Sequence, residues 1–176
     1  MKREQLEHLI RAAGAVAGSR RLIVIGSQAI LGQHPYDAPT EALLSREADM
    51  IPLDAPEMAD AISGVLGELS AFDATFGYHA DGVGFETATL PVGWRDRLVQ
   101  VENPNTNGYI GLCLEVHDLL LSKYFAGREK DRRFCGAIAK AGLAEREILE
   151  DRLGRMDISA ADRERILSRI CADFGG

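Results

Sequence analysis

The 176-residue sequence predicts an α/β protein in which a small mixed β-sheet is flanked by helices and followed by a C-terminal helical part. Three patterns lead to this prediction. A short, wholly apolar run at 22–25 is typical of a strand buried on both faces. Segments at 4–17 and 58–69 carry apolar residues at helical spacing. Beyond Gly142 the chain is highly charged and helical in pattern.

The first elements alternate between helix and strand. The helix at 4–17 is expected to cover one flank of the sheet. Gly26 and Ser27 close the strand at 22–25 with a tight turn, and one or two helical turns follow. Residues 46–53 form a second strand in which side chains alternate between faces, so that Glu47 and Asp49 point the same way. The sequence therefore predicts two carboxylates held side by side.

Strands dominate the middle of the chain. Residues 54–57 have a capping-box pattern that starts the helix over 58–69. Residues 78–89 are interpreted as a β-hairpin that turns at its glycines. Two more strands are expected at 98–102 and 109–116.

The second half is predicted to be helical. Residues 117–131 are expected to form one helix, in which Lys123, Gly127 and Lys130 share a face. One further helix is expected from Glu145, and another is capped by Ser159. We predict an α/β domain at residues 1–140 and a helical extension at 141–176 that packs on the same domain.

Composition narrows the class of protein. With 46% hydrophobic and 27% charged residues, the chain fits one globular domain with a real core. Its three cysteines suit a reducing compartment, and no apolar run approaches the roughly 20 residues that span a bilayer, so a cytoplasmic protein without a membrane partner is expected. A net charge of −7 disfavours a protein built chiefly to bind nucleic acid, although basic residues cluster at 123–133.

Paired carboxylates after a glycine turn are suited to metal-assisted phosphoryl or nucleotidyl transfer. Mg²⁺ prefers oxygen ligands and usually takes one or two carboxylates together with phosphate oxygens and water. A Gly-Ser turn that opens a helix offers backbone N–H groups and a hydroxyl to an anionic triphosphate. Glycine there also lets the phosphate approach the backbone.

At Gly26-Ser27 and Glu47-x-Asp49 the sequence resembles the nucleotidyltransferase superfamily. It is similar in particular to small bacterial members related to the toxins of AbiE-type and AbiG-type abortive-infection systems, and to DUF6036-like proteins. The family pattern is a Gly-Ser or Gly-Gly turn, an acidic-x-acidic strand and a third carboxylate on a neighbouring strand. This chain departs from it in having Glu47 where Asp is more usual.

The resemblance also implies a third metal ligand, for which Glu86 is the first choice. In the family this carboxylate lies just ahead of a segment like Pro91-x-Gly-Trp-x-x-Arg. Asp81 is the second choice, and Glu115 is a rival on the strand expected at 109–116. Glu47, Asp49 and Glu86 are thus the predicted metal ligands and, with Asp131, the predicted catalytic residues.

A second resemblance covers the helix expected at 117–131, because the AbiE-type toxins carry an Asp-x-x-x-x-Lys helix followed by a Lys-Asp pair. Here Asp118, Lys123, Lys130 and Asp131 occupy those places. The resemblance implies that Lys123 contacts the triphosphate and that Asp131 has a supporting or base role. Gly26, Ser27, Lys123 and Lys130 are therefore the predicted nucleotide-binding residues.

These motifs predict a Mg²⁺-dependent nucleotidyltransferase that moves a nucleoside monophosphate from an NTP to an RNA, protein or small-molecule acceptor. Two alternatives remain. One is a catalytically degenerate member of the fold that binds nucleotide without turnover. The other is a subunit of a toxin-antitoxin or regulatory complex that acts with a cognate antitoxin-like protein through its C-terminal helices.

Overall fold

A five-stranded mixed sheet forms the centre of the protein, as seen in a computed structural model that describes residues 1–175. The strand order is β3-β2-β1-β5-β4, and β1 pairs antiparallel with β2 and parallel with β5. β3 is parallel to β2, whereas β4 is antiparallel to β5. The strands are β1 (Arg21–Val24), β2 (Glu47–Pro52), β3 (His79–Gly82), β4 (Val99–Val101) and β5 (Ile110–Cys113).

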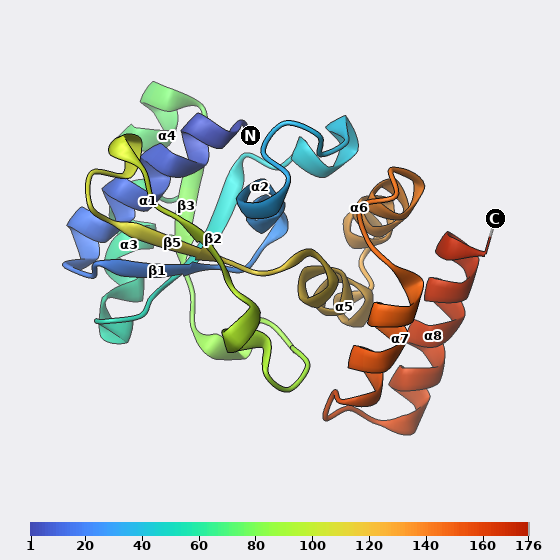
Figure 1. Cartoon of the computed structure of the whole chain (residues 1–176). Coiled ribbons are helices and arrows are strands. Elements are labelled where there is room, and N and C mark those ends of the chain that lie inside the picture. Colours follow the sequence, from blue (N-terminus) through green and yellow to red (C-terminus); the bar gives the residue numbers. More distant parts are fainter. Residues whose placement is uncertain (176) are drawn as a thin grey trace.

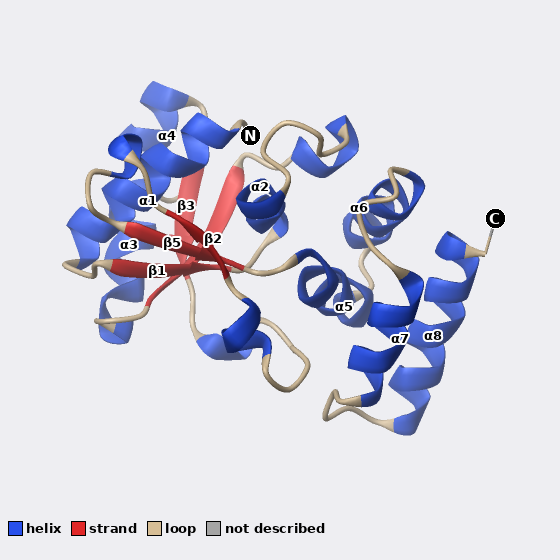
Figure 2. Cartoon of the chain, in the orientation of Figure 1, coloured by secondary structure: helices blue, strands red, loops and turns tan. Residues whose placement is uncertain are grey.

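Helices cover the sheet and continue beyond its end (Figures 1 and 2). α1 and α3 pack against each other and against strands, whereas α5 to α8 pack together where the chain leaves β5. The α/β fold class predicted from sequence is confirmed. The helices are α1 (Arg3–Ala17), α2 (Ile30–Gln33), α3 (Ala59–Leu66), α4 (Ala71–Phe76), α5 (Val116–Ala126), α6 (Glu129–Lys140), α7 (Arg146–Gly154) and α8 (Ala160–Phe174).

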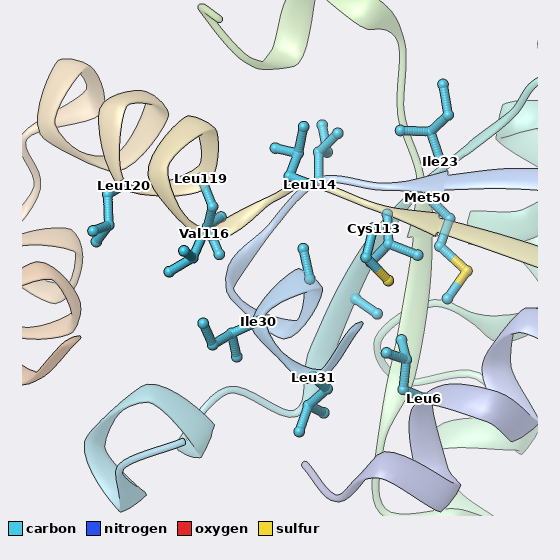
Figure 3. Packing of buried hydrophobic residues seen from close by; sticks show 14 of the residues in the cluster. Leu6, Ile23, Ile30, Leu31, Met50, Cys113, Leu114, Val116, Leu119 and Leu120 are labelled. Carbon is cyan, nitrogen blue, oxygen red and sulfur yellow. The ribbon is translucent and has the colours of Figure 1, made fainter. Parts of the chain in front are cut away.

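One hydrophobic core connects the sheet to these helices. Ile23 in the central strand is 1% exposed, as the apolar run at 22–25 predicts. Figure 3 shows Ile30 of α2 and Leu119 of α5 among the same buried side chains as Met50 and Cys113 of the sheet. Because α2 and α5 are packed on the strand ends in this way, their residues are fixed relative to the sheet.

The predicted hairpin at 78–89 is wrong. β3 pairs in parallel with β2, and Phe85–Thr87 forms a single 3₁₀ turn. The α3 backbone lies directly over Gly82, where an added Cβ would be 1.9 Å from the carbonyl oxygen of Ala59. The glycine therefore serves a close approach between helix and strand rather than a hairpin turn.

The single helix predicted at 117–131 is also wrong, because the chain turns at Gly127. Gly127 has φ 63° and ends α5, and its N–H donates to the carbonyl of Lys123 at 2.9 Å. Arg165 of α8 donates to the carbonyls of Tyr124 and Phe125, each at 3.2 Å. Glycine in the left-handed region is a common helix end, so Lys123 and Lys130 lie on separate helices.

The helix starts agree with sequence in one of two cases. The predicted capping box at 54–57 is wrong: the Asp54 carboxylate accepts from the Arg21 side chain at 2.5 Å, and a 3₁₀ turn, Pro56–Met58, precedes α3. The cap at Ser159 is confirmed, since its hydroxyl accepts from the Asp162 N–H at 3.0 Å.

Among residues 1–175, no helix has both the length and the apolar character needed to cross a membrane.

Asp73 ties α4 to the start of β2. Its carboxylate accepts from the Arg46 guanidinium at 2.7 Å and from the backbone N–H of Leu69 at 3.2 Å. The latter bond holds Leu69 at φ 64°, although its side chain is 91% exposed. A bulky residue with positive φ is strained, and no burial of this side chain compensates for the strain.

Replacing Leu69 with Gly is expected to raise the free energy of unfolding by about 1 kcal/mol, because glycine adopts a positive φ at little steric cost. Denaturant unfolding of the wild type and the variant measures the difference. Leu69→Ala is the matched control, since it removes the same exposed side chain and keeps the steric conflict. An equal gain in both variants would contradict the strain at this position.

Candidate functional site

The glycine after β1 and the second carboxylate of β2 are in contact. The N–H of Ile25 donates to the carbonyl of Asp49 at 3.0 Å, which extends the β1–β2 pairing to the end of β1. A Cβ added at Gly26 would be 2.0 Å from Oδ2 of Asp49. Any other residue at this position would have to displace the carboxylate, so the sequence Gly-Ser and the acidic strand depend on each other.

Three carboxylates line up on β2 and β3. Asp49 is directly opposite Asp81 in the parallel pairing, and Glu47 is opposite His79. Since alternate residues of a strand share a face, Glu47, Asp49 and Asp81 belong to one face of the sheet. Glu47 is close enough to Asp49 and Asp81 for the charges of these carboxylates to interact.

The crowding of these acids changes their titration. Burial, and then the charge and hydrogen bond of Asp49, raise the pKa of Glu47 against the opposing charges of Lys130 and His79. Burial and the charge of Glu47 likewise raise the pKa of Asp81. A raised pKa means that the protein does not fully stabilise the ionised form of the carboxyl group. A bound cation would stabilise that form.

The chemistry of this donor set fits Mg²⁺, because Glu47, Asp49 and Asp81 offer only hard oxygen ligands. Within residues 1–175, no group of three or more His, Cys, Asp or Glu side chains is gathered closely enough to count as a preformed metal centre. The three acids are thus of the right chemical type for Mg²⁺ but are not gathered into a preformed site. The assignment of a metal to them stays a prediction.

Glu86, the first choice for a third ligand, is placed differently from the strand position expected for it. It is exposed on the turn Phe85–Thr87, and its carboxylate folds back toward Gly84, where an added Cβ would be 2.2 Å from Oε1. Glu86 does line a cavity of about 260 Å³ together with Gly26 and Asp49. Asp81, the second choice, is the carboxylate that the sheet places beside the acidic pair.

Glu115 lies in a separate cluster. It caps α5 by accepting from the N–H of His117 at 3.1 Å, and its carboxylate also pairs with Arg152. Although burial acts to raise its pKa, the hydrogen bonds and charges of His117 and Arg152 hold the pKa of Glu115 at about 2. This carboxylate is already neutralised by its own partners.

Lys123 reaches the cavity from α5 with a buried counter-ion behind it. Its ammonium nitrogen is 3.3 Å from Oδ1 of Asp131, and Arg128 donates to Oδ2 of Asp131 at 2.7 Å. Burial opposes ionisation of Asp131, but the hydrogen bond from Arg128 and the charge of Lys123 lower its pKa below the ordinary value. Asp131 is 1% exposed, so it holds two cations in position and offers no free base.

Ser27 and Lys130 line a second cavity of about 540 Å³, which Arg133 also borders. Ser27 directly follows Gly26, and Lys130 follows Arg128 by two positions. The two cavities therefore border the same Gly-Ser turn and the same start of α6. Of the predicted nucleotide-binding residues, Gly26 and Lys123 face the first cavity, whereas Ser27 and Lys130 face the second.

Comparison with models of known protein families identifies the family of this chain. A family model described as a nucleotidyltransferase of unknown function (DUF6036) matches residues 4–167. The chain belongs to this family. The match assigns the DUF6036 protein to the nucleotidyltransferases and extends well past the residues that carry the recognised motifs, into α8. Neither the curated proteins nor the solved structures include a match to the chain.

In this DUF6036 protein the Asp of the Asp-x-x-x-x-Lys motif lies away from the acids of the sheet. Asp118 is fully buried, and Arg97 donates to its two oxygens at 2.8 and 3.0 Å. Arg152 of α7 donates to Asp118 at 3.0 Å. Asp118 thus joins the turn Trp94–Arg97 to α5 and α7.

The sequence pointed to Arg128 only as a member of the basic cluster at 123–133, and Asp81 was the second choice for the third ligand. Arg128 precedes Asp131 by three residues, a spacing that would have suggested the pair had the helix start been known. Asp81 gave no signal of its own, because its place beside Asp49 depends on the parallel pairing of β2 and β3. That pairing becomes visible only when the hairpin interpretation is abandoned.

Replacing Glu47 with Gln is expected to stabilise the DUF6036 protein increasingly as pH rises. The pKa of Glu47 is higher when folded than its unfolded value of 4.5, so the folded state binds more protons in this range and the free energy of unfolding falls with pH. Gln removes this pH-dependent loss of stability. The gain in the free energy of unfolding is at most about 1 kcal/mol, because solvent screens a half-exposed group.

Denaturant unfolding of both proteins from about pH 4 to about pH 8 tests this linkage. Glu164→Gln, at an exposed position in α8, serves as the control and should show a pH-independent difference from the wild type. A constant difference for Glu47→Gln as well would show that the acids of β2 and β3 do not repel each other.

Proposed function

We propose that this protein transfers a nucleoside monophosphate from an NTP to a hydroxyl acceptor in a Mg²⁺-dependent reaction. The observation that supports this most directly is the contact of Gly26 with Asp49 in a cavity that the cations Lys123 and Arg128 also line. A carboxylate ligand and two cations around one cavity suit a metal-bound triphosphate. The family match supports the same class of reaction.

Glu47, Asp49 and Asp81 are the residues that would hold the metal, and Glu86, which lines the 260 Å³ cavity with Asp49, is the alternative third ligand. Mg²⁺ bound there supplies charge stabilisation to the triphosphate and to the attacking and leaving oxygens. The raised pKa values of Glu47 and Asp81 accord with this role, because binding of a cation favours their ionised forms.

Lys123 and Arg128 would neutralise charge on the triphosphate. Lys123 is only 8% exposed and is held by Asp131 at 3.3 Å, so its ammonium group is oriented before substrate arrives. Fixed charges of this kind stabilise the transition state without reorganisation. Ser27 and the adjoining backbone offer further donors, and Lys130 extends the positive wall.

The acceptor oxygen would attack the α-phosphorus while the bond from phosphorus to the bridging oxygen breaks and pyrophosphate leaves. The acceptor proton needs a carboxylate nearby, and Asp81, which lies beside Asp49 in the sheet, suits this role better than Asp131, which is already paired with Lys123 and Arg128. Glu47 and Asp81 also line a cavity of about 280 Å³ with His79, which gives an acceptor access to them. The acceptor is a hydroxyl of an RNA, a protein or a small molecule, and an antitoxin-like partner stays a prediction.

Calorimetric titration of the four NTPs, with and without Mg²⁺, tests the proposal. At least one NTP is expected to bind only when Mg²⁺ is present, and Asp49→Asn is expected to weaken that binding at least about tenfold, since one charged ligand is worth more than about 1.4 kcal/mol. Asp157→Asn, at an exposed position between α7 and α8, is the control and should bind as the wild type does.

Release of pyrophosphate separates catalysis from binding in the same samples. Mg²⁺-dependent NTP binding without pyrophosphate release in the presence of total RNA, a cell-protein mixture and a metabolite mixture would support the catalytically degenerate alternative. Absence of binding by all four NTPs would exclude the proposed function.

Gly26→Ala is expected to abolish Mg²⁺-NTP binding while leaving the fold intact. The added methyl group meets the flexible end of Asp49 at 2.0 Å rather than backbone, so the carboxylate must move but the sheet need not. Circular dichroism and thermal unfolding check the fold, and calorimetry checks binding. Retained nucleotide affinity with a displaced Asp49 would contradict the role of this contact.

A further inference from the structure

A groove runs along α6 on the side that faces the segment 39–45. The 540 Å³ cavity and a further cavity of about 500 Å³ make up this groove, and they adjoin because Glu41 and Arg133 line both. The 3₁₀ turn Thr40–Leu43 packs against α6 and belongs to the opposite wall (Figure 1). No residue lines both this groove and the 260 Å³ cavity.

α6 contributes one continuous stripe of residues to the groove. Counted from the first of them, they fall at positions i, i+3, i+4, i+7, i+10 and i+11, which is the spacing of a single helix face. Glu129 and Gly136 flank this stripe on one side, at 100° per residue. The stripe consists of Lys130, Arg133, Phe134, Ala137, Lys140 and the following residue Ala141.

The surface of the groove between the two lysines of this stripe is mainly apolar. Phe134 and Ala137 line it from α6, and Ala42 and Leu44 line it from the opposite wall. Leu44 is 73% exposed, although it lies beside this apolar surface. An apolar concave surface of this kind is suited to side chains of another molecule.

The positive charge of the groove lies at its two ends. Glu129 is 2.5 Å from Arg133, so these two charges offset each other. Lys130 and Lys140 are exposed, and neither forms an ion pair within residues 1–175. Ten residues of helix separate them, a distance of about 15 Å. The groove therefore offers two cations, one at each end of an apolar surface.

The walls of the groove favour a helical occupant over an extended one. The backbone groups inside α6 bond within the helix, and the edge strands β3 and β4 line neither cavity. A bound strand would find no free strand edge to pair with. An occupant must therefore satisfy its own backbone, as an α-helix does.

The same walls favour a protein over a nucleic acid. A phosphate backbone needs cations along its whole path. Here the stretch between the lysines is apolar, and the carboxylates of Glu41 and Glu129 line the groove as well. The net charge of −7 adds a general repulsion of polyanions. Isolated carboxylates on an apolar helix match the two lysines without this conflict.

We propose that the groove binds an amphipathic helix of a partner protein. Its apolar side chains, at spacings of three and four residues, contact Phe134 and Ala137. Two of its carboxylates, about ten or eleven residues apart, pair with Lys130 and Lys140. The docking does not depend on the proposed function, although Ser27 and Lys130 at one end of the groove take part in both.

Selection from a phage-displayed library of random peptides tests the docking, with peptides of about 16 residues that can form about four helical turns. The full chain without nucleotide is the target. Ala137→Glu serves for counter-selection, because its carboxylate enters the groove and repels an acidic helix. The retained peptides are expected to have apolar residues at helical spacing and an excess of Asp and Glu. Failure to retain peptides of this pattern would overturn the proposal.

A retained peptide is then titrated into the variants by fluorescence anisotropy. Ala137→Glu should weaken binding at least about tenfold more than Ala137→Gln, which adds the same volume without the charge. Lys140→Glu should also weaken binding, and replacing one Glu of the peptide with Lys should restore it. Equal losses for the two Ala137 variants, without restoration for Lys140→Glu, would contradict the charge pairing.

Ala161→Glu is the matched control, because it places the same side chain at an exposed alanine of α8. This variant should bind the peptide as the wild type does. Circular dichroism and thermal unfolding of every variant verify that it folds. A loss of binding in Ala161→Glu equal to that in Ala137→Glu would show that the peptide does not occupy the groove.

Two further measurements would reveal a different occupant. Labelled single-stranded RNA is expected to bind the wild type and the Ala137 variants alike, and light scattering is expected to show no self-association that these variants abolish. RNA binding that both Ala137 variants abolish would assign the groove to nucleic acid, and self-association that they abolish would assign it to a second copy of the chain. Either result would overturn the proposal. Since these samples hold no NTP, such failures leave the proposed function untouched.

Discussion

The register between β1 and β2 is the constraint on which the site depends. Ile23 pairs with Ile51 and Val24 with Met50, and this pairing brings the end of β1 beside Asp49. A slip of one residue would turn Asp49 to the opposite face and place a buried residue in the cleft. Because both strands are largely buried, the core that stabilises the fold also fixes the contact between Gly26 and Asp49.

Two buried aspartates stabilise the other side of the cleft, each by holding two cations. Asp131 binds Lys123 and Arg128, and Asp118 binds Arg97 and Arg152. Buried ion pairs of this kind are uncertain contributors to stability, since desolvation opposes their attraction. Their effect here is geometric: each holds a cationic side chain or a loop in one place. The net charge of −7 therefore coexists with a locally positive wall.

Local sequence patterns predicted the elements well where one chemical rule dominates. The apolar strand at 22–25, the helix at 4–17 and the cap at Ser159 follow from burial, helical spacing and a hydroxyl at a helix start. The hairpin at 78–89 failed because Gly82 accommodates the backbone of α3, a contact with a residue distant in sequence. The single helix predicted through Gly127 failed because this glycine adopts a left-handed conformation and ends α5, so the spacing of Lys123 and Lys130 does not place them on one helix. The same holds for the candidate site. Gly26 and Asp49 lie together as their motif predicts, whereas the position of Asp81 beside Asp49 follows from the pairing of β2 with β3 and cannot be read from local sequence.

The end of α5 connects the C-terminal helix to the cleft. Arg165 donates to the last carbonyls of α5, and the Tyr124 hydroxyl donates to Asp173 at 2.7 Å. A fragment shortened to the sheet and α6 would leave these carbonyls and the start of the Gly127 turn without their donors, one residue from Lys123. A fragment meant to keep Lys123 in its place therefore has to include α8, even though that helix contributes no residue to either cavity.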